Sequence, residues 1–120
     1  MFTLKPFFKI TIMQLIITDD FLRNIVLDYS SNKVSKIEPF FLSNNYVADS
    51  DVIALDANVF YFVKYFSNGD GALQFKLDSN IVMSIETDTN KDSYILVNEI
   101  DLSGVSSRNV EVIGWKITTE

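Results

Sequence analysis

The chain has 120 residues, of which 48% are hydrophobic and 22% charged, and its formal net charge is −6. This length suits one core, and the apolar content is enough to offset the chain entropy that folding removes. The sequence contains no cysteine and no histidine, which excludes disulfides, thiolate zinc sites and Ser-His-Asp catalysis. We therefore expect residues 1–120 to form a single β-rich domain that is not an enzyme.

Basic side chains are few and scattered along the chain. There are 10 Lys and Arg against 16 Asp and Glu, and only two of the basic residues are Arg, at positions 23 and 108. A phosphate-binding surface needs clustered Lys and Arg, so we expect no direct nucleic-acid binding. No stretch reaches the roughly 20 apolar residues that span a bilayer. We therefore expect a soluble chain without membrane contact.

The chain begins with a predicted strand and a predicted helix. Phe8 to Ile12 alternates apolar and polar residues, which is the periodicity of a strand. Residues 1–12 are expected to be an N-terminal arm or edge strand that can dock on a neighbour. Thr18 supplies an N-cap, and the apolar residues after it share one helical face, which predicts a helix over 19–29. The alternative is a strand over 24–29.

Residues 30–51 have the least regular pattern in the chain. Short strands are predicted at 34–37 and 40–42, on either side of Pro39, which cannot donate a hydrogen bond inside a sheet. The residues Ser43-Asn44-Asn45 indicate a turn. A further short strand is predicted at 52–55.

The most distinctive stretch is residues 59–66, in which five of eight residues are aromatic. The glycine-rich residues 67–71 follow, and then an apolar run at 72–77, so the pattern predicts a β-hairpin. Strand parity separates a Phe face, predicted to lie in the core, from a Tyr and Val face. We expect the second face to be covered by the helix, by the N-terminal arm or by another chain.

Further strands are predicted at 81–85, 94–100 and 110–118, joined by a tight turn at 78–80 and by loops at 87–92 and 102–109. The apolar residues of the last strand change parity near Gly114, which predicts a β-bulge there. Short strands at regular spacing favour a mainly β fold. We expect an antiparallel β-sandwich or jelly-roll-like barrel of about seven or eight strands with one short α-helix.

Three acidic or glycine-rich patterns are candidates for functional sites. Residues 88–92 with Glu99 match the acidic positions of a calcium loop, but Ser93 replaces its glycine and Lys91 adds a positive charge, so we interpret them as a solvated turn. Residues 67–71 suit a hairpin better than an anion cradle, because no helix follows them. We expect no catalytic, metal or cofactor site. The carboxylate pairs Asp49 and Asp51, Asp88 and Asp92, and Glu99 and Asp101 are interpreted as solvated strand ends.

The residues predicted to contact a partner are Tyr61, Val63, Tyr65 and Trp115, because tyrosine and tryptophan are favoured at interfaces. The leading hypothesis is a non-enzymatic structural or assembly subunit in a homo- or hetero-oligomer, for example a small virion or phage accessory protein. Such a protein would reside in a virion or in the cytoplasm of the producing cell. One alternative is an acidic protein-binding or inhibitory module acting on a basic partner surface. A carbohydrate-binding domain, which needs an exposed aromatic platform, ranks third.

Overall fold

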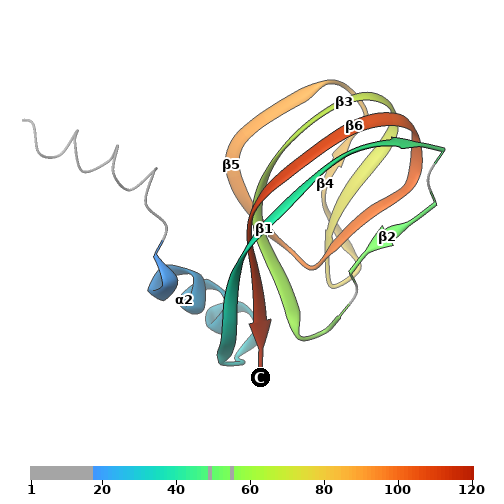
Figure 1. Ribbon diagram of the computed structural model, residues 1–120. Coiled ribbons are helices and arrows are strands. Elements are labelled where there is room, and N and C mark those ends of the chain that lie inside the picture. Colours follow the sequence, from blue (N-terminus) through green and yellow to red (C-terminus); the bar gives the residue numbers. More distant parts are fainter. Residues whose placement is uncertain (1–17, 49, 55) are drawn as a thin grey trace, which may run out of the picture.

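The computed structural model describes residues 18–48, 50–54 and 56–120, and within these the side chains of all but 89–92. They form an antiparallel sheet in which the strand order is β1-β6-β3-β4, with β2 beside β6 and β5 beside β3 (Figure 1). The mainly β class with one short helix is confirmed, and the sheet is not closed into a barrel. The elements are α2 (Asp19–Ser30), β1 (Val34–Val47), β2 (Val52–Ile53), β3 (Val59–Leu77), β4 (Asn80–Ile85), β5 (Thr89–Val97) and β6 (Glu99–Thr119).

Two long strands, β3 and β6, build both layers of the molecule. The first part of β3, residues 59–70, pairs with residues 107–118 of β6, and the second part of β3 pairs with the beginning of β6. Both strands curve between these parts (Figure 1). The first layer is completed by β1 and β5, and the second layer by β2 and β4. The core lies between the two layers.

The hairpin predicted at residues 59–77 is wrong, because these residues form one continuous strand. Gly69 and Gly71 have φ values of 128° and 91°, which L side chains rarely adopt, and the register shifts between Asp70 and Gly71. These glycines bend β3 into the second layer, and both halves pair with β6 instead of with each other. The predicted loop at 102–109 is likewise part of β6, and the predicted turn at 43–45 is part of β1. The described residues therefore form six strands, and the strand expected over residues 8–12 is not among the described residues.

The β-bulge predicted at Gly114 is also wrong. Gly114 pairs with Phe40 on one side and Val63 on the other, within runs of unbroken register. The change of parity has another cause: Val112 faces the core, whereas Ile117 faces the helix on the opposite side of the sheet. Glycine is needed here because a Cβ atom at this position would lie 2.1 Å from the carbonyl oxygen of Phe62.

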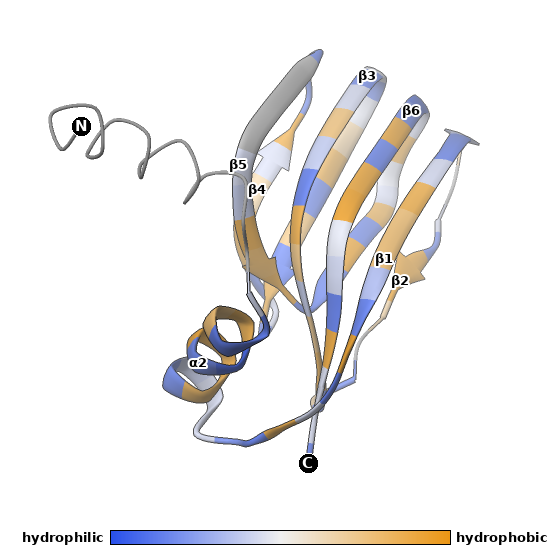
Figure 2. Cartoon of the chain, turned by 60° about the vertical axis from the view of Figure 1, so that its left-hand side comes forward, coloured by the Kyte–Doolittle hydropathy of each residue, from blue (hydrophilic) through white to orange (hydrophobic). Residues whose placement is uncertain are grey.

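The helix α2 packs across one end of the sheet and confirms the prediction for residues 19–29. Thr18 caps it by accepting a hydrogen bond from the Phe21 N–H, and Ser31, whose φ is 64°, caps its C-terminal end. Leu22 and Val26 are its buried residues, and they pack against Phe60, Ile117 and their neighbours on the outer side of β3 and β6. Figure 2 shows α2 at this end of the sheet. The alternative strand over 24–29 is wrong.

The assignment of the two faces of β3 is reversed relative to the prediction. Tyr61, Val63 and Tyr65 point between the layers and belong to the main core with Phe75. Phe60 belongs instead to the smaller cluster under α2. The Tyr and Val face is covered by the second layer of the same chain, because β3 bends over itself. The predicted turn at 78–80 is confirmed, since Asp78 and Ser79 have positive φ, whereas the predicted strand and arm before residue 13 lie outside the described residues.

Candidate functional site

The outer face of the first layer presents ordered rows of side chains from β1, β6 and β3. Cross-strand pairing sets these rows, because residues paired across the sheet lie side by side on the same face. One row is mainly apolar, the next is mixed and the third consists of amides. From the side of α2 outward, they are Phe41, Ile113 and Lys64; Ser43, Glu111 and Phe66; and Asn45, Asn109 and Asn68.

An apolar patch lies on this face, made of Pro39, Phe41, Ile113 and Trp115. Phe41 and Ile113 are direct cross-strand partners, and they are 65% and 48% exposed. Pro39 and Trp115 form the neighbouring pair on the side of α2. Trp115 is half-buried, with its ring 5.6 Å from that of Tyr94. Large apolar side chains therefore adjoin one another at the surface over β1 and β6.

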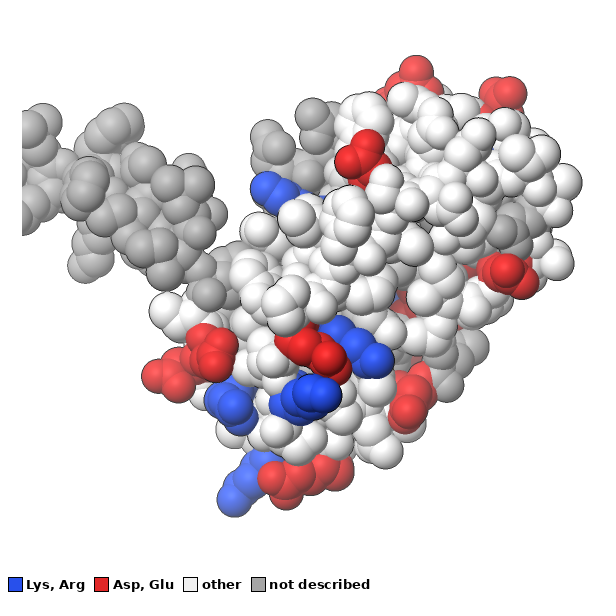
Figure 3. Space-filling model, in the orientation of Figure 1, with Lys and Arg blue, Asp and Glu red and all other residues white. Residues whose placement is uncertain are grey.

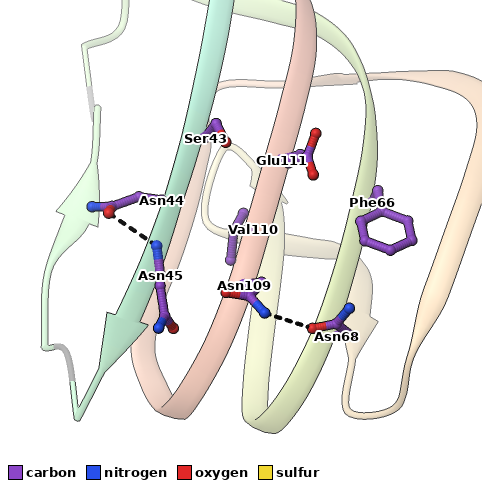
Figure 4. Close-up of a pocket in the computed structure, with 8 residues that line it drawn as sticks. All are labelled: Ser43, Asn44, Asn45, Phe66, Asn68, Asn109, Val110 and Glu111. Carbon is purple, nitrogen blue, oxygen red and sulfur yellow. Dashed lines mark hydrogen bonds between the residues drawn. The ribbon is translucent and has the colours of Figure 1, made fainter.

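An amide hollow follows the apolar patch on the same face, at the end away from α2. Its volume is about 310 Å³. The Asn109 side-chain amide donates to the Asn68 side-chain oxygen at 2.9 Å, and Phe66, which is 38% exposed, stands beside them. Figure 4 shows these side chains projecting from three neighbouring strands. The residues that line the hollow are Ser43, Asn44, Asn45, Phe66, Asn68, Asn109, Val110 and Glu111.

The outer edge of β1 is obstructed against the addition of another strand. Ala48 donates its N–H to Ser106 of β6, so the even-numbered residues of β1 bond toward β6 and the odd-numbered ones face the edge. Pro39 has no N–H to offer on that edge. The N–H of Asn45 is taken by the Asn44 side-chain oxygen at 2.9 Å. Proline and local capping are common protections of an edge strand.

Three of the four residues predicted to contact a partner are buried in the chain's own core. Tyr61 lies with its ring 4.7 Å from Phe40, and Tyr65 lies 4.8 Å from Phe75. Burial raises the pKa of both tyrosine hydroxyls, and Val63 is fully buried. Only Trp115 lies on the outer face. The sequence could have indicated Phe41 and Ile113 only if the pairing of β1 with β6 had been known.

The acidic residues near β6 form an ion cluster with Lys76. The Lys76 amine lies 2.8 Å from Asp101 and 3.7 Å from Glu99. The hydrogen bond from Lys76, helped by Ser103, lowers the pKa of Asp101 from 3.8 to about 2, and the same bond raises the pKa of Lys76. Both carboxylates therefore form ion pairs with Lys76 that link β6 to β3. Glu99, which would close the calcium loop, is buried in this cluster.

The other acidic side chains that the structure describes also lack the arrangement of a metal site. Asp88 accepts a hydrogen bond from the Gly69 N–H at 3.2 Å. Asp49 and the side chain of Asp92 lie outside the described residues. In the described ranges, no group of three or more acidic side chains is placed to hold a metal ion.

A buried arginine at the bend of the long strands was not singled out by its sequence. Arg108 is 1% exposed. Its Nε donates to the Gly71 carbonyl at 2.7 Å, one terminal nitrogen to the Ser67 hydroxyl at 3.1 Å, and the other to the Thr87 carbonyl at 3.3 Å. Through these contacts, Arg108 of β6 holds β3 and the segment before β5 together. No sequence signal distinguished it from Arg23, which is exposed.

Comparison with protein-family models, curated proteins and solved structures gives no match. The helix in the described part of the chain is too short and too polar to cross a membrane. The outer face, with its apolar patch and its amide hollow, is therefore the feature of the described residues that points to a function.

Proposed function

We propose that this protein is a non-enzymatic assembly subunit that packs its apolar patch against another protein subunit. The observation that carries the proposal is the pair Phe41 and Ile113, which are adjacent across β1 and β6 and exposed. Contiguous exposed apolar side chains of this size are typical of surfaces that another protein covers. A small virion or phage accessory protein is one setting in which such a subunit serves.

The partner to which we commit is a second copy of the chain. The chain carries a net charge of −6, so two copies repel each other unless they meet through a neutral face. None of the four patch residues is charged and two of them are aromatic, and charge depletion with aromatic enrichment is the composition of an interface core. A two-fold axis brings identical patches together, as in most homodimers.

The two alternative functions have less support. An inhibitor of a basic surface needs its acidic residues on one face, but on the face in Figure 3 they are dispersed, and Lys and Arg lie among them near α2. A glycan platform built on Tyr61 and Tyr65 is not present, because both are buried. These observations favour the assembly subunit.

Light scattering coupled to size-exclusion chromatography, from micromolar to millimolar concentration, tests the proposal. We expect the wild type to dimerise and the double variant Phe41→Ser, Ile113→Thr to remain monomeric. The matched control is Ile81→Thr, Val82→Ser, which removes two exposed apolar side chains from β4 in the other layer; it should dimerise like the wild type. A wild type that stays monomeric at millimolar concentration, or a dimer that survives in the patch variant, overturns the proposal.

A further inference from the structure

The amide hollow is separate from the apolar patch and is a second, polar feature of the outer face. None of the four patch residues lines it. Its volume of about 310 Å³ is at the lower end of the roughly 300–1,000 Å³ that small-molecule sites occupy. It therefore has room for a ligand of one or two small rings.

We propose that the amide hollow binds a neutral carbohydrate, with Phe66 as the stacking surface and Asn68, Asn109 and Glu111 as hydrogen-bonding groups. This inference does not depend on the assembly function, since it concerns different side chains.

The side-chain amides of Asn68 and Asn109 are held in place, and each keeps a hydrogen-bonding group that is free to bind a ligand. The bond from Asn109 Nδ2 to Asn68 Oδ1 is 2.9 Å long. It fixes both side chains and leaves the Asn68 NH₂ group as a donor and the Asn109 oxygen as an acceptor. A sugar hydroxyl both donates and accepts, so neighbouring hydroxyls of one ring can use both groups. Fixing the amides before binding reduces the entropy that binding costs.

The charge of the lining selects against other ligand classes. Glu111 is the one ionisable residue among those that line the hollow, and Lys and Arg do not occur there. Phosphates and nucleic acids need basic side chains, and calcium takes six to eight oxygen ligands, usually several of them carboxylates. A neutral polyol fits, because the Glu111 carboxylate accepts hydrogen bonds from hydroxyl groups.

Phe66 lies in the right place to support a ring. It projects on the same face of β3 as Asn68, two residues further along, which is a separation of about 7 Å in a strand. Its exposed ring offers an apolar surface to the C–H face of a sugar while the hydroxyls reach the amides. An extended peptide is the rival ligand, but it would dock beside β1, where Pro39 and the Asn44 side chain obstruct the edge.

The test is a screen of neutral gluco-, xylo-, manno- and chito-oligosaccharides, followed by an NMR titration with the best binder. We expect micromolar to millimolar binding with shift changes at residues 66–68 and 109–111. Phe66→Ala and Asn68→Ala should each weaken binding by about tenfold, with thermal melting to verify that the variants fold. The patch variant Phe41→Ser, Ile113→Thr is the control and should bind like the wild type.

Three outcomes overturn the inference: no neutral oligosaccharide binds, binding persists unchanged in Phe66→Ala, or only extended peptides shift the hollow residues. Loss of binding in the hollow variants alone supports it, and because the control variant separates the hollow from the patch, failure of one proposal leaves the other standing.

Discussion

Arg108 holds three segments together at the point where both long strands bend. Its guanidinium group donates to Gly71 and Ser67 of β3 and to Thr87 before β5. All three acceptors are neutral, and they satisfy the donors of a guanidinium group that is almost fully buried. The planar fork of arginine reaches three directions at once, which lysine cannot do.

We therefore expect Arg108→Lys to lower the free energy of unfolding by about 3 kcal/mol, because it leaves the buried Ser67 hydroxyl without its donor and a buried ammonium poorly bonded. Arg23→Lys is the matched control: Arg23 is exposed and makes one bond, to the Val34 carbonyl at 2.9 Å. It should cost less than about 1 kcal/mol. Urea denaturation measures the free energy of unfolding of both variants. An equal decrease in the two would contradict the structural role of Arg108.

Asp101 should give the protein a specific sensitivity to acid. Its pKa is lowered from 3.8 to about 2 in the folded state, so its contribution to stability is present above pH 4 and is lost as the pH falls through about 2. We expect Asp101→Asn to be less stable than the wild type by about 1–2 kcal/mol at pH 6, and this difference to shrink toward pH 2. Denaturation curves at a series of pH values measure it.

Lys76→Met removes the other partner of the same bond and should show the same convergence with the wild type at low pH. A destabilisation of Asp101→Asn that stays constant from pH 6 to pH 2 would mean that the carboxylate charge has no part in holding β3 against β6.

At the scale of the elements, local signals predicted α2 but not the course of β3 and β6. The cap at Thr18 and the helical spacing of Leu22 and Val26 depend on neighbours in sequence, so the sequence alone identifies them. Gly69 and Gly71 allow either a reversal or a bend. Which of these occurs depends on pairing with β6, about 40 residues later, and a local pattern does not contain that information.

The same limit explains why three of the four residues predicted to contact a partner lie in the core. The alternation of residues along β3 correctly separated its Phe face from its Tyr and Val face. Which of the two faces lies in the core depends on the strands that pack across it, and the alternation does not reveal them. The bend brings Leu73 and Phe75 over Tyr61, Val63 and Tyr65. Phe41 and Ile113 are ordinary strand residues in sequence and become adjacent only through the register of β1 with β6.

A substitution at Gly114 tests the close contact between the backbones of β3 and β6. An added Cβ atom would lie 2.1 Å from the Phe62 oxygen and 2.8 Å from the Val63 Cα, both backbone atoms. We expect Gly114→Ala to lower the free energy of unfolding by about 2–3 kcal/mol, because β3 and β6 must separate locally. In the control Gly104→Ala, the nearest atom is 3.0 Å away, and the expected cost is about 1 kcal/mol or less. Thermal or urea unfolding distinguishes them, and a Gly114→Ala protein as stable as Gly104→Ala would disprove the contact.

At the scale of the whole molecule, the two sides of the first layer have different surroundings. Its inner side forms the core with the second layer, and one end of its outer side is covered by α2. On the rest of the outer side, the exposed side chains change from apolar in the patch to amides in the hollow within a few rows. One rigid sheet thus presents two chemically distinct surfaces next to each other, on strands whose opposite face is packed.

The sharing of β3 and β6 between layers also governs how the molecule can come apart. In a sandwich of two separate sheets, one sheet can loosen while the other persists. Here each layer contains half of both central strands, so melting one layer removes the strands that the other needs. Among the described strands, the peripheral ones, β1, β2, β4 and β5, each pair with a single neighbour and can detach singly. The chain therefore behaves as one cooperative unit with frayed edges, and neither layer can serve as a hinge or a lid for the other.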